Sequence, residues 1–159
     1  MNTELLQQVT AFIWTEADML DQLEYNAWLE LWEEDGLYVV PIDRSPNTEY
    51  SNVLNYAYDD KNMRTLRVER LTGGESISTS PVPRTVRQVS RIRIISDANG
   101  IITVRAAQLM TEYRKSNIRY NTADVEFQLA RTLDSFKIKR KKVLLINSDD
   151  ALVTVGYIF

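Results

Sequence analysis

Asp35 and Tyr38 are the residues of this chain whose types and spacing could perform chemistry together. A carboxylate can act as a general base and a tyrosine hydroxyl can stabilise an oxyanion, which would suit isomerisation or dehydration of a small carbonyl compound. An Asp and a Tyr three positions apart are also common by chance. Asp35 has a simpler explanation as the end of a helix before Gly36. We therefore rank this enzymatic or ligand-binding hypothesis below a structural role.

The 159 residues contain no histidine and no cysteine. Histidine is the commonest metal ligand, and cysteine supplies thiolate nucleophiles and ligates zinc and iron–sulfur clusters. The chain therefore has no Ser-His-Asp or Cys-His triad, no zinc site of the usual kind, no iron–sulfur centre and no 2-His-1-carboxylate iron site. Any chemistry would have to come from carboxylates, Lys, Tyr, Ser and Thr.

The composition is that of one soluble globular domain, with 44% hydrophobic and 26% charged residues. A net charge of −3 argues against nucleic acid as a partner. No stretch approaches the roughly 20 apolar residues that cross a membrane, and the first residues lack the pattern of a signal peptide. We expect a single domain over residues 1–159, a cytoplasmic location and no membrane partner.

Apolar residues recur at three- and four-residue steps over residues 5–23, which predicts a helix packed on a core. They are Leu5, Leu6, Val9, Phe12, Ile13, Met19, Leu20 and Leu23. A second, shorter stripe predicts another helix that ends at Asp35-Gly36, and it consists of Tyr25, Trp28, Leu29 and Trp32. We interpret Trp28, Trp32 and Tyr38 as core aromatics, with the lining of a ligand pocket as the alternative.

Residues 37–40 predict a strand that Pro41 stops, and residues 43–58 predict a long loop. Asp59 is the expected N-cap of a third helix that ends at Gly73-Gly74. We expect one face of this helix to carry Met63, Leu66 and Arg70. Residues 73–83 are a second expected loop.

From Arg84 onward the apolar period changes to two, which is typical of strands. The alternation places Val86, Ile92 and Ile94 against Arg87, Arg91 and Arg93. Asn99-Gly100 predicts a hairpin, because this dipeptide tolerates the positive φ of a type I′ turn. Further strands are expected around 102–106, 125–129 and 136–146, with turns at 115–117 and 134–135.

Helices followed by a meander of antiparallel strands indicate an α+β fold. Strands of about a dozen residues exceed the usual length, so the sheet needs curvature. We expect the N-terminal helices to pack in a strongly curved, mostly antiparallel sheet shaped like a cone.

Four fragments in order resemble the beta (small) subunits of aromatic-ring-hydroxylating dioxygenases. They are residues 25–41 (YNAWLELWEEDGLYVVP), 58–70 (YDD followed by LRVER), 80–90 (SPVPRTVRQVS) and 139–145 (KRKKVLL). The likeness runs from about Leu5 to Phe159. The chain departs from the family at Arg91, where Asn is frequent, and at Asn147, where Asp is frequent.

The resemblance implies the cone-shaped, cystatin-like fold of nuclear-transport-factor-2-like and SnoaL-like proteins. It also implies a non-catalytic assembly subunit with no cofactor of its own. The expected partners are an alpha (large) subunit, which would hold a Rieske [2Fe–2S] cluster and mononuclear Fe(II), and further copies of this chain in an α3β3 hexamer. Electrons would come from NAD(P)H through partner proteins. The absence of His and Cys agrees with this division of labour.

Six residues are candidate subunit contacts: Arg84, Arg87, Arg91, Tyr157, Ile158 and Phe159. Guanidinium groups suit pairing with carboxylates at interfaces, whereas the alternative is an exposed strand face with salt bridges worth roughly 0–1 kcal/mol each. An apolar segment such as 157–159 must pack in a core or in a subunit contact. The basic run at 137–142 is expected to present Lys137, Lys139 and Lys141 on one face of a strand, which is solvated or meets an acidic partner surface. The negative net charge disfavours a nucleic-acid or membrane patch there.

Overall fold

The computed structural model describes residues 2–45, 49–73, 83–150 and 158–159. Its helices are α1 (Thr3–Asp21), α2 (Tyr25–Leu29) and α3 (Lys61–Thr72), with a 3-10 turn, η1 (Tyr50–Asn52). The strands are β1 (Trp32–Pro41), β2 (Asn55–Asp59), β3 (Arg84–Ala98), β4 (Ile101–Arg114), β5 (Asn117–Arg131) and β6 (Phe136–Leu145). They form one sheet in the order β2-β1-β6-β5-β4-β3. Neighbouring strands are antiparallel except for β1 and β6, which are parallel.

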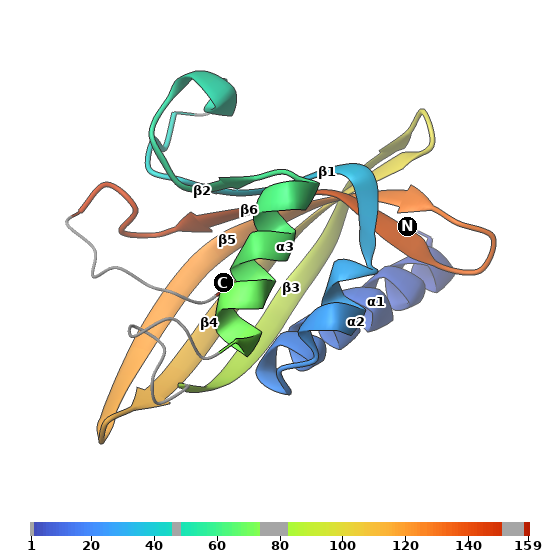
Figure 1. Ribbon diagram of the computed structural model, residues 1–159. Coiled ribbons are helices and arrows are strands. Elements are labelled where there is room, and N and C mark those ends of the chain that lie inside the picture. The colour runs from blue at the N-terminus through green and yellow to red at the C-terminus, as the bar shows by residue number, and fades with distance from the viewer. Residues whose placement is uncertain (1, 46–48, 74–82, 151–157) are drawn as a thin grey trace.

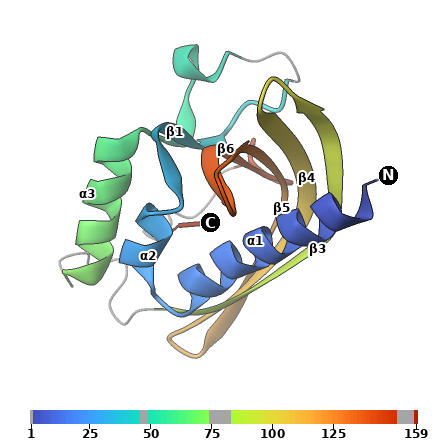
Figure 2. The same cartoon turned by 90° about the vertical axis from the view of Figure 1, so that its right-hand side faces the viewer.

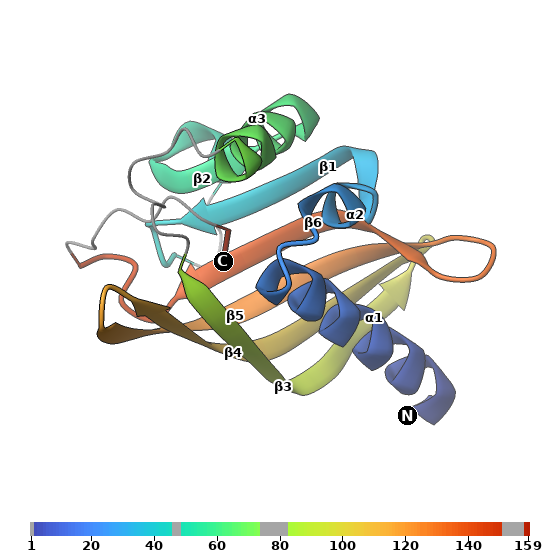
Figure 3. The same ribbon diagram turned by 60° about the horizontal axis from the view of Figure 1, so that its bottom comes forward.

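The sheet curls without closing, and α1 crosses its concave face (Figures 1 and 2). Seen from below, α2 continues from α1 over β1 and β6, while α3 lies beside β1 and β2 (Figure 3). The core fills the space between α1 and the inner face of the sheet, where Val9, Ile13, Val104 and Val125 are fully buried. The expected α+β fold with a strongly curved, mostly antiparallel sheet is confirmed.

The first helix forms as its sequence predicts. Asn2 caps it, because its side-chain oxygen accepts a hydrogen bond of 3.0 Å from the Leu5 amide. The buried positions follow the expected stripe from Leu5 to Leu20, whereas Leu23 lies beyond the helix and is half exposed. The stripe also contains Glu16, which is 1% exposed. A carboxylate on the core side of a helix requires a partner inside the fold.

The prediction that the second helix continues to Asp35-Gly36 is wrong. The helix α2 ends at Leu29, and Trp32 already lies in β1 together with Asp35 and Gly36. The Ile138 amide donates to the Leu31 carbonyl at 2.7 Å, so pairing with β6 begins at once. A Cβ at Gly36 would lie 2.8 Å from the Ile138 carbonyl oxygen and 2.9 Å from the Trp32 ring. The glycine therefore permits close strand approach rather than ending a helix.

The segment expected to be a loop at 43–58 contains η1 and β2 in its described part. The expected cap of α3 is also displaced by one residue, because Asp60 and not Asp59 accepts from the Met63 amide, at 3.0 Å. The buried face of α3 carries Arg64, Val68 and Leu71, whereas the expected Met63 and Leu66 are exposed. The predicted end at Gly73 is confirmed.

The alternation predicted for β3 is wrong in its first half. Arg87 and Val89 face the core, whereas Val86 is 61% exposed. The pairing of β3 with β4 then shifts between Ser90 and Arg93, and Arg91 adopts a φ of +52°. Such a bulge places one extra residue in the strand, so Ile92 and Ile94 return to the inner side.

A register shift between β5 and β6 overturns the prediction for the basic run. Gln128 pairs with Arg140 and Leu129 pairs with Ile138, so Lys139 has no partner position on β5. The inward face of β6 therefore changes from even to odd positions along the strand. Lys141 is 0% exposed, in contrast to the solvated face expected for it. The hairpin at Asn99-Gly100 is confirmed, with φ values of +57° and +78°.

Candidate functional site

The structure does not bring Asp35 and Tyr38 together. The Asp35 side chain is 68% exposed and pairs with Lys139 Nζ at 2.6 Å. The hydrogen bond from Lys139 lowers the pKa of the Asp35 carboxyl group. Tyr38 is buried at 1% exposure among Trp28 and Trp32, whose rings meet it edge to face. The three aromatic residues are core residues, as predicted, and the acid–base pair of the enzymatic hypothesis does not exist.

A buried ion pair lies inside the cone between α1 and β6. Glu16 Oε2 accepts from Lys141 Nζ at 2.8 Å and from Trp28 Nε1 at 2.7 Å. Lys141 Nζ also donates to the Phe159 carbonyl at 3.0 Å. Burial lowers the pKa of Lys141, and the nearby Glu16 carboxylate opposes that shift. We refer to Glu16, Lys141, Trp28 and Tyr38 as the interior polar cluster.

Tyr38 lies opposite Asp59 in the pairing of β1 with β2, next to a second buried ion pair. Its hydroxyl oxygen accepts a hydrogen bond of 2.9 Å from the Phe159 amide. On the neighbouring strand, the buried Asp59 carboxylate receives two hydrogen bonds from Arg67, at 2.6 and 3.0 Å. Burial raises the pKa of Tyr38 well above its usual range, and the bond from Phe159 opposes the rise only in part.

Replacing Tyr38 by phenylalanine is expected to flatten the fall of stability at alkaline pH. The folded protein keeps the Tyr38 proton where the unfolded chain releases it, so the free energy of unfolding decreases as the pH rises above about 10. One such proton contributes a limiting slope of about 1.4 kcal/mol per pH unit. Urea unfolding between about pH 9.5 and 11.5 measures this slope. Tyr120→Phe, a substitution at an exposed tyrosine, is the control. Equal slopes for wild type and Tyr38→Phe would contradict the assignment.

The three candidate interface arginines occupy different environments. The Arg87 side chain is 3% exposed and donates from Nη1 to Asp21 Oδ1 at 2.5 Å and from Nη2 to the Ile158 carbonyl. Arg84 is exposed and lies over the Tyr113 ring, 5.4 Å from its centroid. Arg91 is exposed and pairs with Asp124 at 2.9 Å. Sequence alone treats the three alike, but only Arg84 and Arg91 point outward.

Of the apolar segment at 157–159, Tyr157 lies outside the described residues. Ile158 and Phe159 are 1% and 7% exposed and belong to the core. The structure thus places these two residues inside the cone of their own chain.

Exposed apolar side chains gather on the convex side of the sheet near the β4–β5 turn. Tyr113 on β4 lies between Arg84 on β3 and Ile118 on β5 in the strand pairing. Two residues along each strand, Thr111 lies between Val86 and Tyr120 in the same way. The apolar members are between 41% and 66% exposed. We call Arg84, Val86, Tyr113, Ile118 and Tyr120 the outer sheet face. Exposed apolar side chains grouped in this way are typical of interaction sites.

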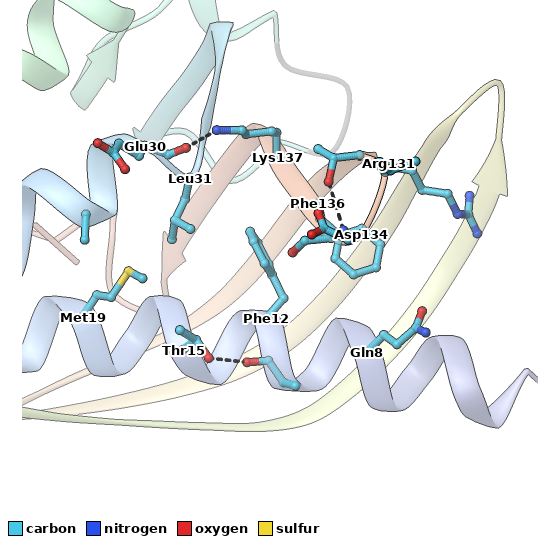
Figure 4. A pocket seen from close by; sticks show the side chains of 15 residues that line it. Gln8, Phe12, Thr15, Met19, Glu30, Leu31, Arg131, Asp134, Phe136 and Lys137 are labelled. Carbon is cyan, nitrogen blue, oxygen red and sulfur yellow. Dashed lines mark hydrogen bonds between the residues drawn. The ribbon is translucent and has the colours of Figure 1, made fainter.

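A groove of about 850 Å³ opens between α1, α2 and the β5–β6 turn (Figure 4). Phe12 and Phe136 meet edge to face at its base. Its cations are engaged: Arg131 pairs with Asp97 at 2.8 Å, and Lys137 donates to the Glu30 carbonyl. Neither Asp35 nor Tyr38 lines the groove, so it does not support the enzymatic hypothesis either.

The donor set of this chain does not fit an iron centre. The sequence offers no His or Cys, and the described residues contain no group of three or more acidic side chains that could hold a metal ion. Nor does the described part of the chain include a helix with the length and apolarity needed to cross a membrane.

Residues 15–149 match the family model described as ring hydroxylating beta subunit. The chain belongs to this family. The small subunit of anthranilate 1,2-dioxygenase from Acinetobacter baylyi is 28% identical over 157 residues, covering 92% of this chain and 93% of that protein. The expected family is confirmed, and with it the role of a subunit in a ring-hydroxylating oxygenase.

Solved structures agree with the fold. The beta subunit of benzoate 1,2-dioxygenase from Burkholderia mallei superposes with a TM-score of 0.76 at 24% identity, covering 94% of this chain and 95% of that one. An NTF2-like protein with a cystatin-like fold from Novosphingobium aromaticivorans gives a TM-score of 0.62 at 13% identity, covering 89% of this chain and 81% of that one. The cone-shaped fold expected for the family is therefore confirmed.

Sequence reasoning missed the buried charges that organise this beta-subunit fold. They include Glu16, Asp59, Arg64, Glu112 and Lys141. The burial of Glu16 could have been predicted, because this residue stands at helical spacing between Ile13 and Leu20 within the apolar stripe. The burial of Lys141 could not have been predicted, because Lys141 is one of several consecutive basic residues.

Proposed function

We propose that this chain is the non-catalytic assembly subunit of a Rieske-type aromatic-ring dioxygenase. One observation carries the proposal. The chain matches the ring-hydroxylating beta-subunit family, and its own side chains fill its interior, among them Trp28, Tyr38, Phe127 and Lys141. Such an interior supports a scaffold role rather than turnover inside the cone. The hypothesis of a separate isomerase or ligand binder based on Asp35 and Tyr38 has no geometric support.

The proposed partner is an alpha subunit that holds the Rieske [2Fe–2S] cluster and a mononuclear Fe(II), neither of which this chain has the ligands to bind. We propose an α3β3 hexamer in the cytoplasm, reduced by NAD(P)H through partner electron-transfer proteins, that hydroxylates an aromatic compound for catabolism. The names of the relatives, which refer to anthranilate and benzoate, support an aromatic substrate. Native mass spectrometry with metal analysis of the protein from its own host tests this proposal, and a complex free of iron and of any larger chain would contradict it.

The outer sheet face is the proposed subunit contact within this assembly. Its apolar side chains are exposed, and Arg84 presents a guanidinium group to a partner, as does Arg91 seven positions further along β3. Arg87, Ile158 and Phe159 are buried inside the chain, so we propose that they support this interface by fixing β3 rather than by contacting a partner. The contribution of Tyr157 stays a prediction.

Reversing both exposed arginines is expected to weaken assembly at least tenfold. In the proposed contact, the two guanidinium groups pair with carboxylates of a partner subunit. A glutamate at each of positions 84 and 91 would place like charges across that interface, which cost several kcal/mol. Native mass spectrometry of Arg84→Glu/Arg91→Glu over a dilution series measures the loss. Lys61→Glu on α3, also an exposed cation, is the control. An unchanged hexamer mass and salt tolerance in the double variant would contradict the assignment.

A further inference from the structure

The segment Ile158–Phe159 is held inside the cone by side chains from three different strands. The Phe159 amide donates to Tyr38 Oη of β1 at 2.9 Å, and the Phe159 carbonyl accepts from Lys141 Nζ of β6 at 3.0 Å. The Ile158 carbonyl accepts from Arg87 Nη2 of β3. Figure 2 shows this end of the chain inside the curl of the sheet. Buried backbone groups mostly pair with other backbone groups, whereas these three pair with buried side chains.

Each of the three side chains has a second partner that does not belong to the segment. Lys141 is paired with Glu16, which Trp28 also holds. Arg87 is paired with Asp21 at the end of α1, and Tyr38 is packed against the Trp28 ring with centroids 6.3 Å apart. These contacts fix the donors Lys141 and Arg87 and the acceptor Tyr38 independently of Ile158–Phe159. A few oriented polar groups in an apolar wall are what a binding site requires.

We propose that the part of the cone bounded by Tyr38, Lys141 and Arg87 is a peptide-binding site, occupied in this structure by the chain's own Ile158–Phe159. Its ligand class is a short peptide with an apolar residue followed by an aromatic one. Tyr38, Lys141 and Arg87 form hydrogen bonds with the peptide backbone, and the surrounding apolar residues pack against the peptide side chains. This inference goes beyond the assembly role and does not depend on it.

Because the chain's own Ile158–Phe159 occupies the site, a free peptide should not displace this segment from the folded wild-type protein. A ligand tethered to its own site reaches an effective concentration in the millimolar range. The site opens to a peptide in solution only when the tethered segment is weakened. A full-length Ile158→Ser/Phe159→Ser variant does this, because it keeps the three side chains that hold the backbone and removes the apolar groups that they position.

The probe is N-acetyl-Ile-Phe amide, which carries the three backbone groups and both side chains. We expect saturable binding to the double variant, with a dissociation constant of about 10 μM to 1 mM for a ligand of this size, a rise in Tm, and a change in tryptophan fluorescence because Trp28 contacts the cluster. Wild type should show none of these changes, and adding Lys141→Met should weaken binding at least tenfold. N-acetyl-Ile-Ser amide is the matched control peptide. A folded double variant without saturable binding would overturn the proposal.

A measurement on the intact chain covers the case in which the double variant does not fold. Tyr38→Phe removes the acceptor of the Phe159 amide and leaves the ring in place. Its hydrogen exchange at Phe159 should rise at least tenfold relative to the core amides of Val104 and Val125. An unchanged ratio would mean that apolar packing alone holds the segment, and would overturn the binding-site assignment.

Discussion

Glu16→Leu is expected to lower the free energy of unfolding by about 3–5 kcal/mol, because it leaves a buried ammonium without its counter-charge. Lys141 is 0% exposed, and its remaining hydrogen-bond acceptor among the described residues would be the Phe159 carbonyl. The Trp28 indole would lose its acceptor at the same time. Urea unfolding at neutral pH, with the m-value checked for a change of unfolding mechanism, measures the loss.

The second change that tests this explanation is Lys141→Met in the Glu16→Leu background. Removing both charges leaves apolar groups of similar volume, and such replacements of buried pairs are often neutral or stabilising. The double variant should therefore recover most of the loss. Asp18→Leu, an exposed carboxylate on the same helix, should stay within about 0.5 kcal/mol of wild type. A single Glu16→Leu variant as stable as wild type would show that Lys141 does not depend on Glu16.

Arg87→Met is expected to cost about 3 kcal/mol, since it breaks a buried ion pair and leaves Asp21 without its cation. The guanidinium connects three parts of the chain: the end of α1 through Asp21, its own strand β3, and the buried segment through the Ile158 carbonyl. Methionine keeps much of the side-chain volume, so the loss reports the hydrogen bonds and the charge rather than a cavity. Urea unfolding gives the magnitude.

Arg84 provides the matched control for Arg87, three positions earlier on the same strand. Its side chain is exposed and lies over the face of the Tyr113 ring. Arg84→Met should therefore change the free energy of unfolding by no more than about 0.5 kcal/mol. Equal losses at positions 84 and 87 would contradict the inward placement of Arg87. They would instead support the alternative in which both arginines belong to one exposed face.

The sequence alone predicted the features that depend on neighbouring residues. The stripe from Leu5 to Leu20 requires a helix with one buried face, and Asn99-Gly100 requires a tight hairpin, because each is a local preference of the backbone. The family resemblance added the cone fold and the subunit role, both of which the comparisons support. The lack of His and Cys is a property of composition, so it excluded triad chemistry and the usual zinc and iron sites whatever the fold.

Only the tertiary structure decided which charged residues face inward. The register shifts at Arg91 and Lys139 reverse the inward face of β3 and β6, and a bulge is fixed by pairing with another strand, not by the bulged strand's own sequence. For the same reason, Lys141 can be buried only because Glu16, 125 positions away along the chain, lies opposite it. Local sequence predicted many of the elements, whereas the burial of a charge depends on partners that only the complete fold brings near.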